Sequence, residues 1–206
     1  MTSKVVNKRN ILVAIMILAT SILYPASAAP KTQTFSGTDD EVITISAFKD
    51  PVLVTATYEG ESNFIVYPVD SSGKRGFSWF NEIDSWAGRI FQPGVTKAWA
   101  AFAVETQGDW TITISPLSTA KVINPKSYSG SGSDVIKFNK ASKGLRKLTV
   151  THDGESNFFV RPISTKGKQG FSLVNEIGEY NGTTLLPNDT LYLAVIGDGN
   201  WTITVK

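Results

Sequence analysis

Apolar and polar residues alternate with a period of two along much of the chain. Val52, Val54, Ala56 and Tyr58 would share one face of a strand, and residues 42–46 alternate in the same way. Clusters of Gly, Asn, Asp and Pro separate these runs, as they do between short strands. The pattern predicts an all-β fold without a helix of useful length. The expected strands of the first half are residues 42–46, 52–58, 63–69, 77–83, 89–92, 99–104 and 110–115.

A turn signal follows the second of these runs. The step Glu59-Gly60 is typical of a hairpin, in which glycine supplies a positive φ, and Asp153-Gly154 is a similar step later in the chain. We therefore expect the strand that ends at Tyr58 to fold back onto the strand that begins at Asn63.

The chain contains an internal duplication. Residues 60–83 align without a gap on residues 154–177, and 15 of the 24 positions are identical. Each copy extends to a Gly-x-Trp-Thr-Ile-Thr string near its end, so each has the length of a small domain. The sequence predicts two tandem antiparallel β-sandwich domains, of jelly-roll or immunoglobulin-like kind. The predicted domains are residues 29–115 and 127–206, joined by a linker of residues 116–126.

Apolar positions that are identical in both copies and alternate along a strand predict a shared core, because the same packing has to be made twice. The expected core residues are Phe64, Val66, Trp110 and Ile112 in the first copy, and Phe158, Val160, Trp201 and Ile203 in the second.

The first 28 residues match the pattern of a signal peptide. Lys4, Lys8 and Arg9 precede the apolar run of residues 11–23, and the small residues Ala26-Ser27-Ala28 follow it. An uncleaved membrane anchor is the alternative, but the run is shorter than the ~20 residues needed to cross a bilayer. We expect cleavage after Ala28, and a secreted or cell-envelope protein whose mature chain does not span the membrane.

Composition narrows the chemistry. The chain has no cysteine, which excludes disulfides, thiolate metal sites and cysteine nucleophiles. Its formal charge of +2 falls to −1 when the three basic residues of the signal peptide are removed. Residues 34–115 carry five basic and eleven acidic side chains, and residues 127–206 carry nine basic and seven acidic ones. Neither half shows a basic stripe interleaved with aromatics, so we expect no nucleic-acid partner.

No catalytic or metal site is expected. His152 is the only histidine and takes the place of Tyr58 in the first copy, so a site built on it would exist once and would lack a second histidine. The run Asp39-Asp40-Glu41 could offer oxygens to calcium, but it lacks a spaced ligand loop and is interpreted as a solvated turn. No cofactor is implied.

The candidate binding site lies in two corresponding segments. Each is predicted to place an aromatic residue in a turn, close to an amide and a carboxylate, a combination that suits sugar stacking and hydrogen bonding to hydroxyls. The alternative is that the aromatic covers the open end of the sandwich and the asparagine bonds local backbone. The candidate ligand-binding residues are Trp86, Asn81 and Glu82 in the first copy, and Tyr180, Asn175 and Glu176 in the second.

Taken together, three strings identify a resemblance. Gly-Glu-Ser-Asn-Phe, then Asn-Glu-Ile with an aromatic and a glycine after it, then Gly-x-Trp-Thr-Ile-Thr resembles an uncharacterised β-sandwich repeat of secreted bacterial proteins. The resemblance covers both copies and implies a β-sandwich fold, but no activity. The first copy departs from the second at Asp84, where Gly178 stands, and at Trp86, where Tyr180 stands.

The leading hypothesis is a non-catalytic binding module that recognises a glycan or cell-wall polymer through two similar sites. A structural or adhesion spacer, which would contact another envelope protein and no small ligand, is the second hypothesis. A hydrolase that uses the duplicated carboxylates Glu82 and Glu176 is a third.

Overall fold

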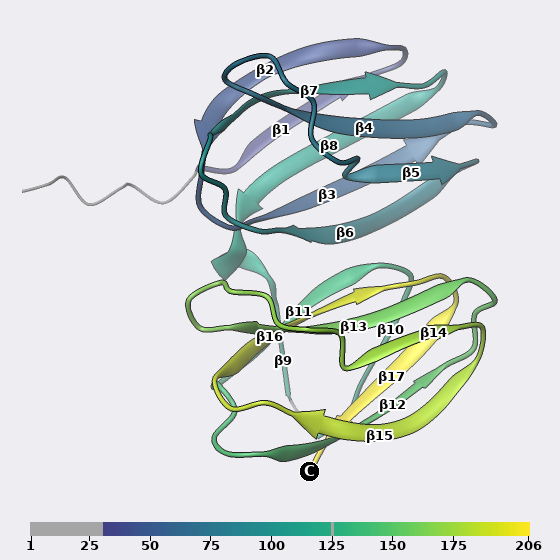
Figure 1. Ribbon diagram of the computed structural model, residues 1–206. Helices are drawn as coiled ribbons and strands as arrows, with labels where there is room; N and C mark the ends of the chain where they lie inside the picture. The colour runs from purple at the N-terminus through teal and green to yellow at the C-terminus, as the bar shows by residue number, and fades with distance from the viewer. Residues whose placement is uncertain (1–30, 125) are drawn as a thin grey trace, which may run out of the picture.

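The computed structural model describes residues 31–124 and 126–206 (Figure 1). The regular structure of these residues is β-strand except for one short 3-10 turn, and the strands form four sheets, so the predicted all-β class is confirmed. The predicted signal peptide, residues 1–28, lies outside the described residues. Within the described part of the chain, no helix has the length and apolar character needed to cross a membrane.

The first half of the chain forms two four-stranded sheets. One has the strand order β1-β8-β3-β6 and the other β2-β7-β4-β5, and neighbours are antiparallel. Apart from β4 and β5, consecutive strands lie in different sheets, so the chain crosses between the sheets at most of its turns. The strands are β1 (Gln33–Gly37), β2 (Glu41–Phe48), β3 (Val52–Glu59), β4 (Asn63–Asp70), β5 (Phe80–Ile83), β6 (Trp86–Gln92), β7 (Trp99–Glu105) and β8 (Asp109–Pro116).

The second half repeats this arrangement strand by strand. Its sheets have the orders β10-β17-β12-β15 and β14-β13-β16-β11-β9, in which β9 is an additional strand that pairs parallel with β11. The elements are η1 (Leu117–Thr119), β9 (Lys121–Ile123), β10 (Tyr128–Ser131), β11 (Asp134–Phe138), β12 (Arg146–His152), β13 (Asn157–Ser164), β14 (Val174–Ile177), β15 (Tyr180–Leu186), β16 (Thr190–Ile196) and β17 (Asn200–Val205).

Each pair of sheets encloses an apolar core. Burial alternates along β4 and β8, so every second side chain points inward, as the period of a strand requires. All eight residues predicted for the core are buried, which confirms that prediction. In the first core, Phe64 stacks on Tyr58 with ring centroids 4.9 Å apart. In the second, Phe158 stacks on His152 at 4.0 Å.

The predicted hairpin between residues 52–58 and 63–69 is wrong. Strand β3 pairs with β6 and β8, whereas β4 pairs with β5 and β7, so residues 60–62 cross from one sheet to the other. Gly60 is not among the residues with positive φ. Glycine is required there by close packing, because a Cβ would collide with the Tyr58 hydroxyl and lie 2.8 Å from the backbone oxygen of Gln107.

The starts of three strands also differ from the sequence prediction. Strand β5 begins at Phe80 and not at residue 77, so Phe77 lies in the connection from β4. Trp86 and Tyr180, predicted in turns, are the first residues of β6 and β15.

Part of the predicted linker also belongs to the fold. Residues 116–126 contain η1 and β9, and β9 joins the five-stranded sheet of the second half. This pairing shortens the free connection between the halves.

The two halves touch through an apolar cluster. Leu53 and Phe91, on β3 and β6, pack in one cluster with residues of η1, β11, β13 and β16. The contact joins the sheet β1-β8-β3-β6 of the first half to the five-stranded sheet of the second. At one edge the backbone N–H of Arg89 donates to the Ser133 oxygen at 2.9 Å, and the Arg89 guanidinium lies 3.6 Å from the Asp134 carboxylate. The contact between the halves is thus mainly apolar, with a polar edge at Arg89.

Candidate functional site

Each half presents one phenylalanine to solvent at the same position of the repeat. Phe77 is 99% exposed and Phe171 is 97% exposed. Burying an aromatic ring is favourable, so a core explains why Phe64 and Phe158 are alike in the two copies. It does not explain why Phe77 and Phe171 are alike, because these rings pack against almost nothing.

The loop that carries Phe77, residues 71–79, is held by the carboxylate at the end of β4. Asp70 accepts hydrogen bonds from the hydroxyl and the backbone N–H of Ser72, at 2.6 and 2.8 Å, and from the backbone N–H of Lys74 at 3.0 Å. The Ser72 hydroxyl and these N–H groups lower the pKa of Asp70 to about 2. The backbone N–H of Gly76 then donates to the Pro68 oxygen at 2.8 Å, which returns the chain along β4.

The corresponding loop of the second half, residues 165–173, has the same backbone hydrogen bond, but a hydroxyl takes the place of the carboxylate that holds the first loop. Ser164 replaces Asp70, and its hydroxyl accepts from the Lys168 backbone N–H at 3.2 Å. The backbone N–H of Gly170 donates to the Pro162 oxygen at 2.8 Å, as Gly76 does to Pro68. The two phenylalanines are therefore displayed by equivalent, hydrogen-bonded loops.

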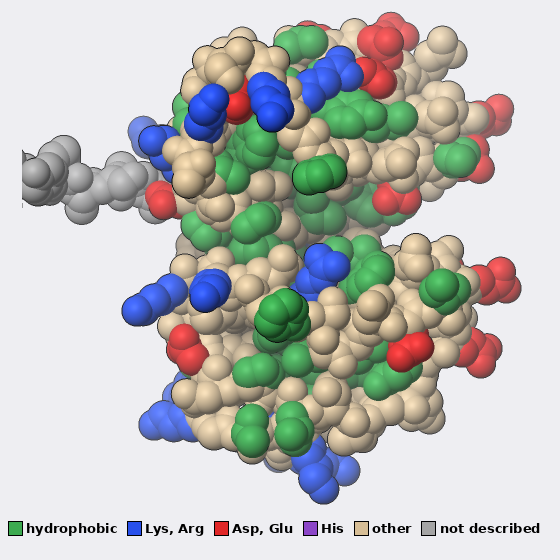
Figure 2. Space-filling view, in the orientation of Figure 1, with side chains coloured by type: hydrophobic (Ala, Val, Ile, Leu, Met, Phe, Trp, Pro, Cys, Tyr) green, Lys and Arg blue, Asp and Glu red, His purple; other side chains and the backbone are tan. Residues whose placement is uncertain are grey.

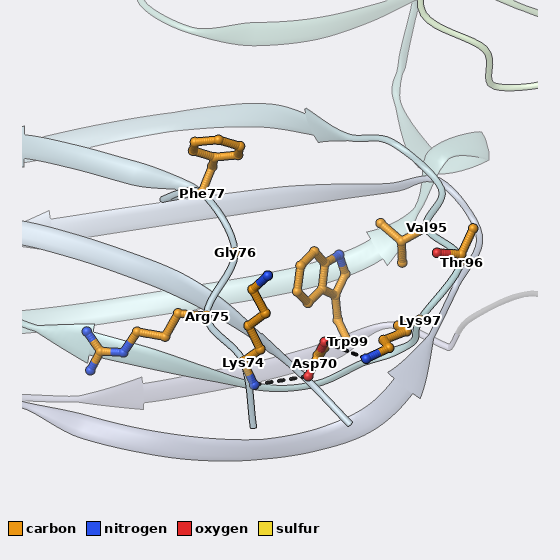
Figure 3. A pocket seen from close by; sticks show the side chains of 9 residues that line it. All are labelled: Asp70, Lys74, Arg75, Gly76, Phe77, Val95, Thr96, Lys97 and Trp99. Carbon is orange, nitrogen blue, oxygen red and sulfur yellow. Dashed lines mark hydrogen bonds and ion pairs between the residues drawn. The ribbon is translucent and has the colours of Figure 1, made fainter. Parts of the chain in front are cut away.

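A depression of about 710 Å³ lies beside Phe77 (Figure 3). The indole of Trp99 lies at its centre, with Lys74 on one side and Val95 on the other. The Trp99 indole N–H is buried and has no hydrogen-bond partner in the described part of the chain. Arg75 also lines the depression, and its guanidinium is fixed by the Glu105 carboxylate at 2.6 Å.

A second depression, of about 520 Å³, extends from Phe77 and Trp99 to the junction between the halves. The Trp79 indole N–H in its wall donates to the Gln92 side-chain oxygen at 2.8 Å. Arg161 of the second half also lines it. This junction cleft combines aromatic walls with amide and guanidinium groups, which can contact sugar rings and hydroxyls respectively.

Two residues predicted for the site of the first half line the junction cleft. They are Glu82 and Trp86. Burial raises the pKa of Glu82. The Trp86 ring lies 5.1 Å from Phe80 and packs against the core, and a Cβ at Gly88 would lie 2.5 Å from it. Asn81 is exposed on β5, opposite Ile65.

The predicted residues of the second half occupy the corresponding strands, but they line none of the depressions described for the molecule. Tyr180 packs against the second core, with its ring centroid 6.4 Å from Phe158. Asn175 and Glu176 are exposed on β14. The depression described for this half, of about 370 Å³, lies instead along the Phe171 loop, with Lys168 and Leu173 in its wall. A binding role for Tyr180, Asn175 and Glu176 stays a prediction.

His152 is buried and hydrogen-bonded to backbone. It is 5% exposed, its Nδ1 lies 2.9 Å from the Gly178 backbone oxygen, and its Nε2 lies 2.6 Å from the Asp198 backbone oxygen.

The candidate calcium turn holds local backbone. Its Asp40 carboxylate accepts a hydrogen bond from the Thr106 backbone N–H at 2.6 Å. In residues 31–124 and 126–206, no group of three or more His, Cys, Asp or Glu is arranged to hold a metal ion.

Sequence reasoning missed Phe77 and Phe171 because the apolar run after each looks like the start of a strand. The available signal was composition: Gly73-Lys74-Arg75-Gly76 and Gly167-Lys168-Gln169-Gly170 precede the two phenylalanines. Paired glycines around charged residues are typical of a loop.

No protein-family model matches the chain, and no curated protein matches it. Among solved structures, the PBSX exported protein XepA is 10% identical, with 87% of this chain and 84% of that chain covered and a TM-score of 0.26. A fucolectin from the serum of striped bass, Morone saxatilis, is 8% identical, with 84% of each chain covered and a TM-score of 0.25. A cupin 2 conserved barrel domain protein from Leptotrichia buccalis is 16% identical, with 86% and 85% covered and a TM-score of 0.25. At TM-scores this low the overlaps carry no argument about function.

Proposed function

We propose that this is a secreted, non-catalytic polysaccharide-binding protein of the cell envelope, in which Phe77 and Phe171 stack on sugar rings. The observation that carries the proposal is the near-complete exposure of both rings at one position of a duplicated loop. An exposed aromatic ring costs solubility without adding to the core, and ring stacking on the apolar face of a sugar is a use that needs this exposure.

Two such positions on one chain suit a polymer. One stacking contact is weak, but a second contact on the same ligand becomes intramolecular and raises the overall affinity without a new kind of interaction. The junction cluster around Leu53 and Phe91 supports this use, because it holds the two loops at a fixed separation.

As part of this proposal, the halves are tandem β-sandwich domains of the jelly-roll kind, related to the secreted bacterial repeat that the motifs resemble. The strand orders β1-β8-β3-β6 and β2-β7-β4-β5 of the first half favour the jelly roll over an immunoglobulin-like arrangement. The second half has the equivalent orders, with β9 added to one sheet. A non-catalytic role is in keeping with the burial of the single histidine between backbone oxygens.

A spacer that contacts another envelope protein is the second candidate. The apolar junction favours it, because rigidly joined domains also serve as a stiff rod. The two candidates differ in one respect. A polysaccharide-binding protein needs Phe77 and Phe171 for its function, whereas a spacer binds no polysaccharide and does not need them.

The test is retention of residues 29–206 on a panel of purified cell-wall and plant polysaccharides. The double variant Phe77→Ala/Phe171→Ala should lose retention, and each single variant should weaken it about fivefold to tenfold, which corresponds to roughly 1 kcal/mol for one aromatic contact. The thermal unfolding midpoint should be unchanged, because neither ring is packed.

The matched control is Ile83→Ala/Ile177→Ala. These residues are also apolar, also duplicated, and 70% and 79% exposed, but they line none of the three depressions described above. The control should bind as the unmodified protein does. Retention that survives in the phenylalanine variant would refute the proposal. Loss in Trp86→Ala/Tyr180→Ala with unchanged unfolding would move the site to the residues predicted from sequence.

A further inference from the structure

Charged residues in the loops separate to opposite ends of the molecule. Successive connections alternate between the two ends because the strands are antiparallel. The end with connections β2–β3, β4–β5, β6–β7 and their counterparts carries eight basic and two acidic residues. They are Lys49, Lys74, Arg75, Lys97, Lys140, Lys143, Lys166 and Lys168, with Asp50 and Asp189.

The opposite end is acidic. Its connections carry no basic residue and eight acidic ones: Asp39, Asp40, Glu61, Asp84, Asp153, Glu155, Glu179 and Asp198. Figure 2 shows the result, with most acidic side chains on the right of both halves and most basic ones on the left. The net charge is therefore near zero although the charges are strongly separated between the two ends of the molecule.

Both exposed phenylalanines belong to loops of the basic end. Lys74 and Arg75 precede Phe77. Lys168 precedes Phe171 by the same number of residues as Lys74 precedes Phe77. The lysine is identical in the two copies, as the phenylalanine is. Of the cations in the depression beside Phe77, Arg75 is paired with Glu105 at 2.6 Å, while the Lys97 amine is 3.9 Å from Asp70.

The depressions at this end are connected. A fourth depression, of about 720 Å³, lies between the halves, and its charged lining residues are Lys49, Asp50, Lys166 and Lys168. It shares Val95 and Thr96 with the depression beside Phe77. It shares Lys168 and Gln169 with the depression beside Phe171. Six basic residues line these three depressions, together with Asp50, Asp70 and Asp189. A net basic track thus runs from one phenylalanine to the other across the junction.

We infer that the ligand is an acidic polysaccharide, and that one chain of it lies along this track and contacts both halves. The inference rests on the proposed function and adds the charge and the path of the ligand. Positive charge at the track and negative charge at the far end attract and orient a polyanion. The rings supply stacking and the lysines pair with the acid groups, whether these are carboxylates or phosphates.

The geometry favours a polysaccharide over other polyanions. Nucleic-acid tracks stack successive bases on successive aromatics, whereas this track has one exposed ring in each half. A bilayer would contact projecting tips, whereas these rings stand beside grooves.

The first test compares polygalacturonate, a phosphomannan and neutral dextran as probes for residues 29–206. We expect an acidic polymer to bind, with affinity falling at least tenfold between 50 and 300 mM NaCl because salt screens charge pairs. Lys74→Gln/Lys168→Gln should weaken binding about tenfold. The control Glu61→Gln/Glu155→Gln, duplicated residues of the acidic end, should stay within twofold. Which acidic polymer binds identifies the acid group.

The second test concerns the path. Thr96 is exposed and lines both the first and the middle depression. Thr96→Trp should block a long polygalacturonate chain and lower its affinity to that of a trimer, while trimer binding stays unchanged. Equal effects on long chain and trimer would overturn the single-chain path.

The outcomes separate the two proposals. Binding that requires Phe77 and Phe171 but is equal for dextran and insensitive to salt overturns this inference and leaves the proposed function intact. Tighter binding to anionic phospholipid vesicles or to oligothymidine overturns both. Binding that depends on Lys74 and Lys168 but survives loss of the phenylalanines refutes the proposed stacking function.

Discussion

Replacement of Phe91 by alanine should weaken the coupling between the two halves. Phe91 points away from the core of the first half, yet it is only 8% exposed because the junction covers it. Loss of a buried phenylalanine side chain in a core costs about 3–5 kcal/mol. A junction has fewer neighbours than a core, so we expect about 3 kcal/mol, the lower end of that range.

Differential scanning calorimetry of residues 29–206 is the assay. For a chain of this size, 1 kcal/mol corresponds to roughly 2–4 °C, so Phe91→Ala should lower the first transition by about 6–12 °C. It should also separate one transition into two, because the two halves, once uncoupled, would unfold independently.

The repeat supplies a matched control. Leu185 occupies the same position of the second copy as Phe91, but it is 53% exposed among the residues that the structure describes. Leu185→Ala should cost less than about 0.5 kcal/mol. An equal shift in the two variants, or an unchanged single transition in Phe91→Ala, would refute the claim that the junction stabilises the fold.

Two further predictions concern the residues that shape the turns. Gly60→Ala should lower the free energy of unfolding, measured by urea titration, by about 2 kcal/mol or more, because the Cβ meets the Tyr58 ring and the Gln107 carbonyl; an unchanged free energy of unfolding would contradict the close approach. Ionised Asp70, whose folded pKa of about 2 lies below the usual 3.8, should stabilise the fold above pH 4 and lose that effect as the pH falls toward 2. Asp70→Asn should therefore lose less stability than the unmodified protein between pH 5 and pH 2.5, and an identical loss would show that the loop does not depend on this charge.

The strands and the core could be predicted because alternation along a strand reflects burial directly. Residues 63–69 and 110–115 were expected as strands, and β4 and β8 cover them. The buried members Phe64, Val66 and Trp110 follow from the same alternation. Strand β1 was missed because it is short and half-buried, so its pattern is weak.

Strand pairing could not be predicted, because a turn signal acts locally and pairing depends on distant segments. Glu59-Gly60 is compatible with a hairpin, but β3 finds its partners in β6 and β8. Closing two sheets over one core requires the chain to cross between them at this point. The glycine serves that crossing through its lack of a side chain, and not through its backbone angle.

Whether a candidate residue can bind a ligand depends on whether its side chain points toward the core or toward solvent. The residue type alone does not reveal this direction. Trp86 and Tyr180 are aromatic residues close in sequence to amides and carboxylates, yet both pack against the cores. Phe77 and Trp79 are two residues apart in one apolar run, yet Phe77 is exposed and Trp79 is 6% exposed. The loop fixed by Asp70 and Gly76 brings only Trp79 onto the core.

By itself, the sequence determined the all-β class, the duplication and the identity of the core, because these depend on local periodicity and on comparison of the chain with itself. The tertiary structure decided which sheet each strand joins and which faces the two halves use at their junction. It also placed Lys74, Phe77, Lys168 and Phe171 at one end and the acidic turns at the other. Charges scattered along the sequence become a polarity only when antiparallel strands bring alternate connections to opposite ends.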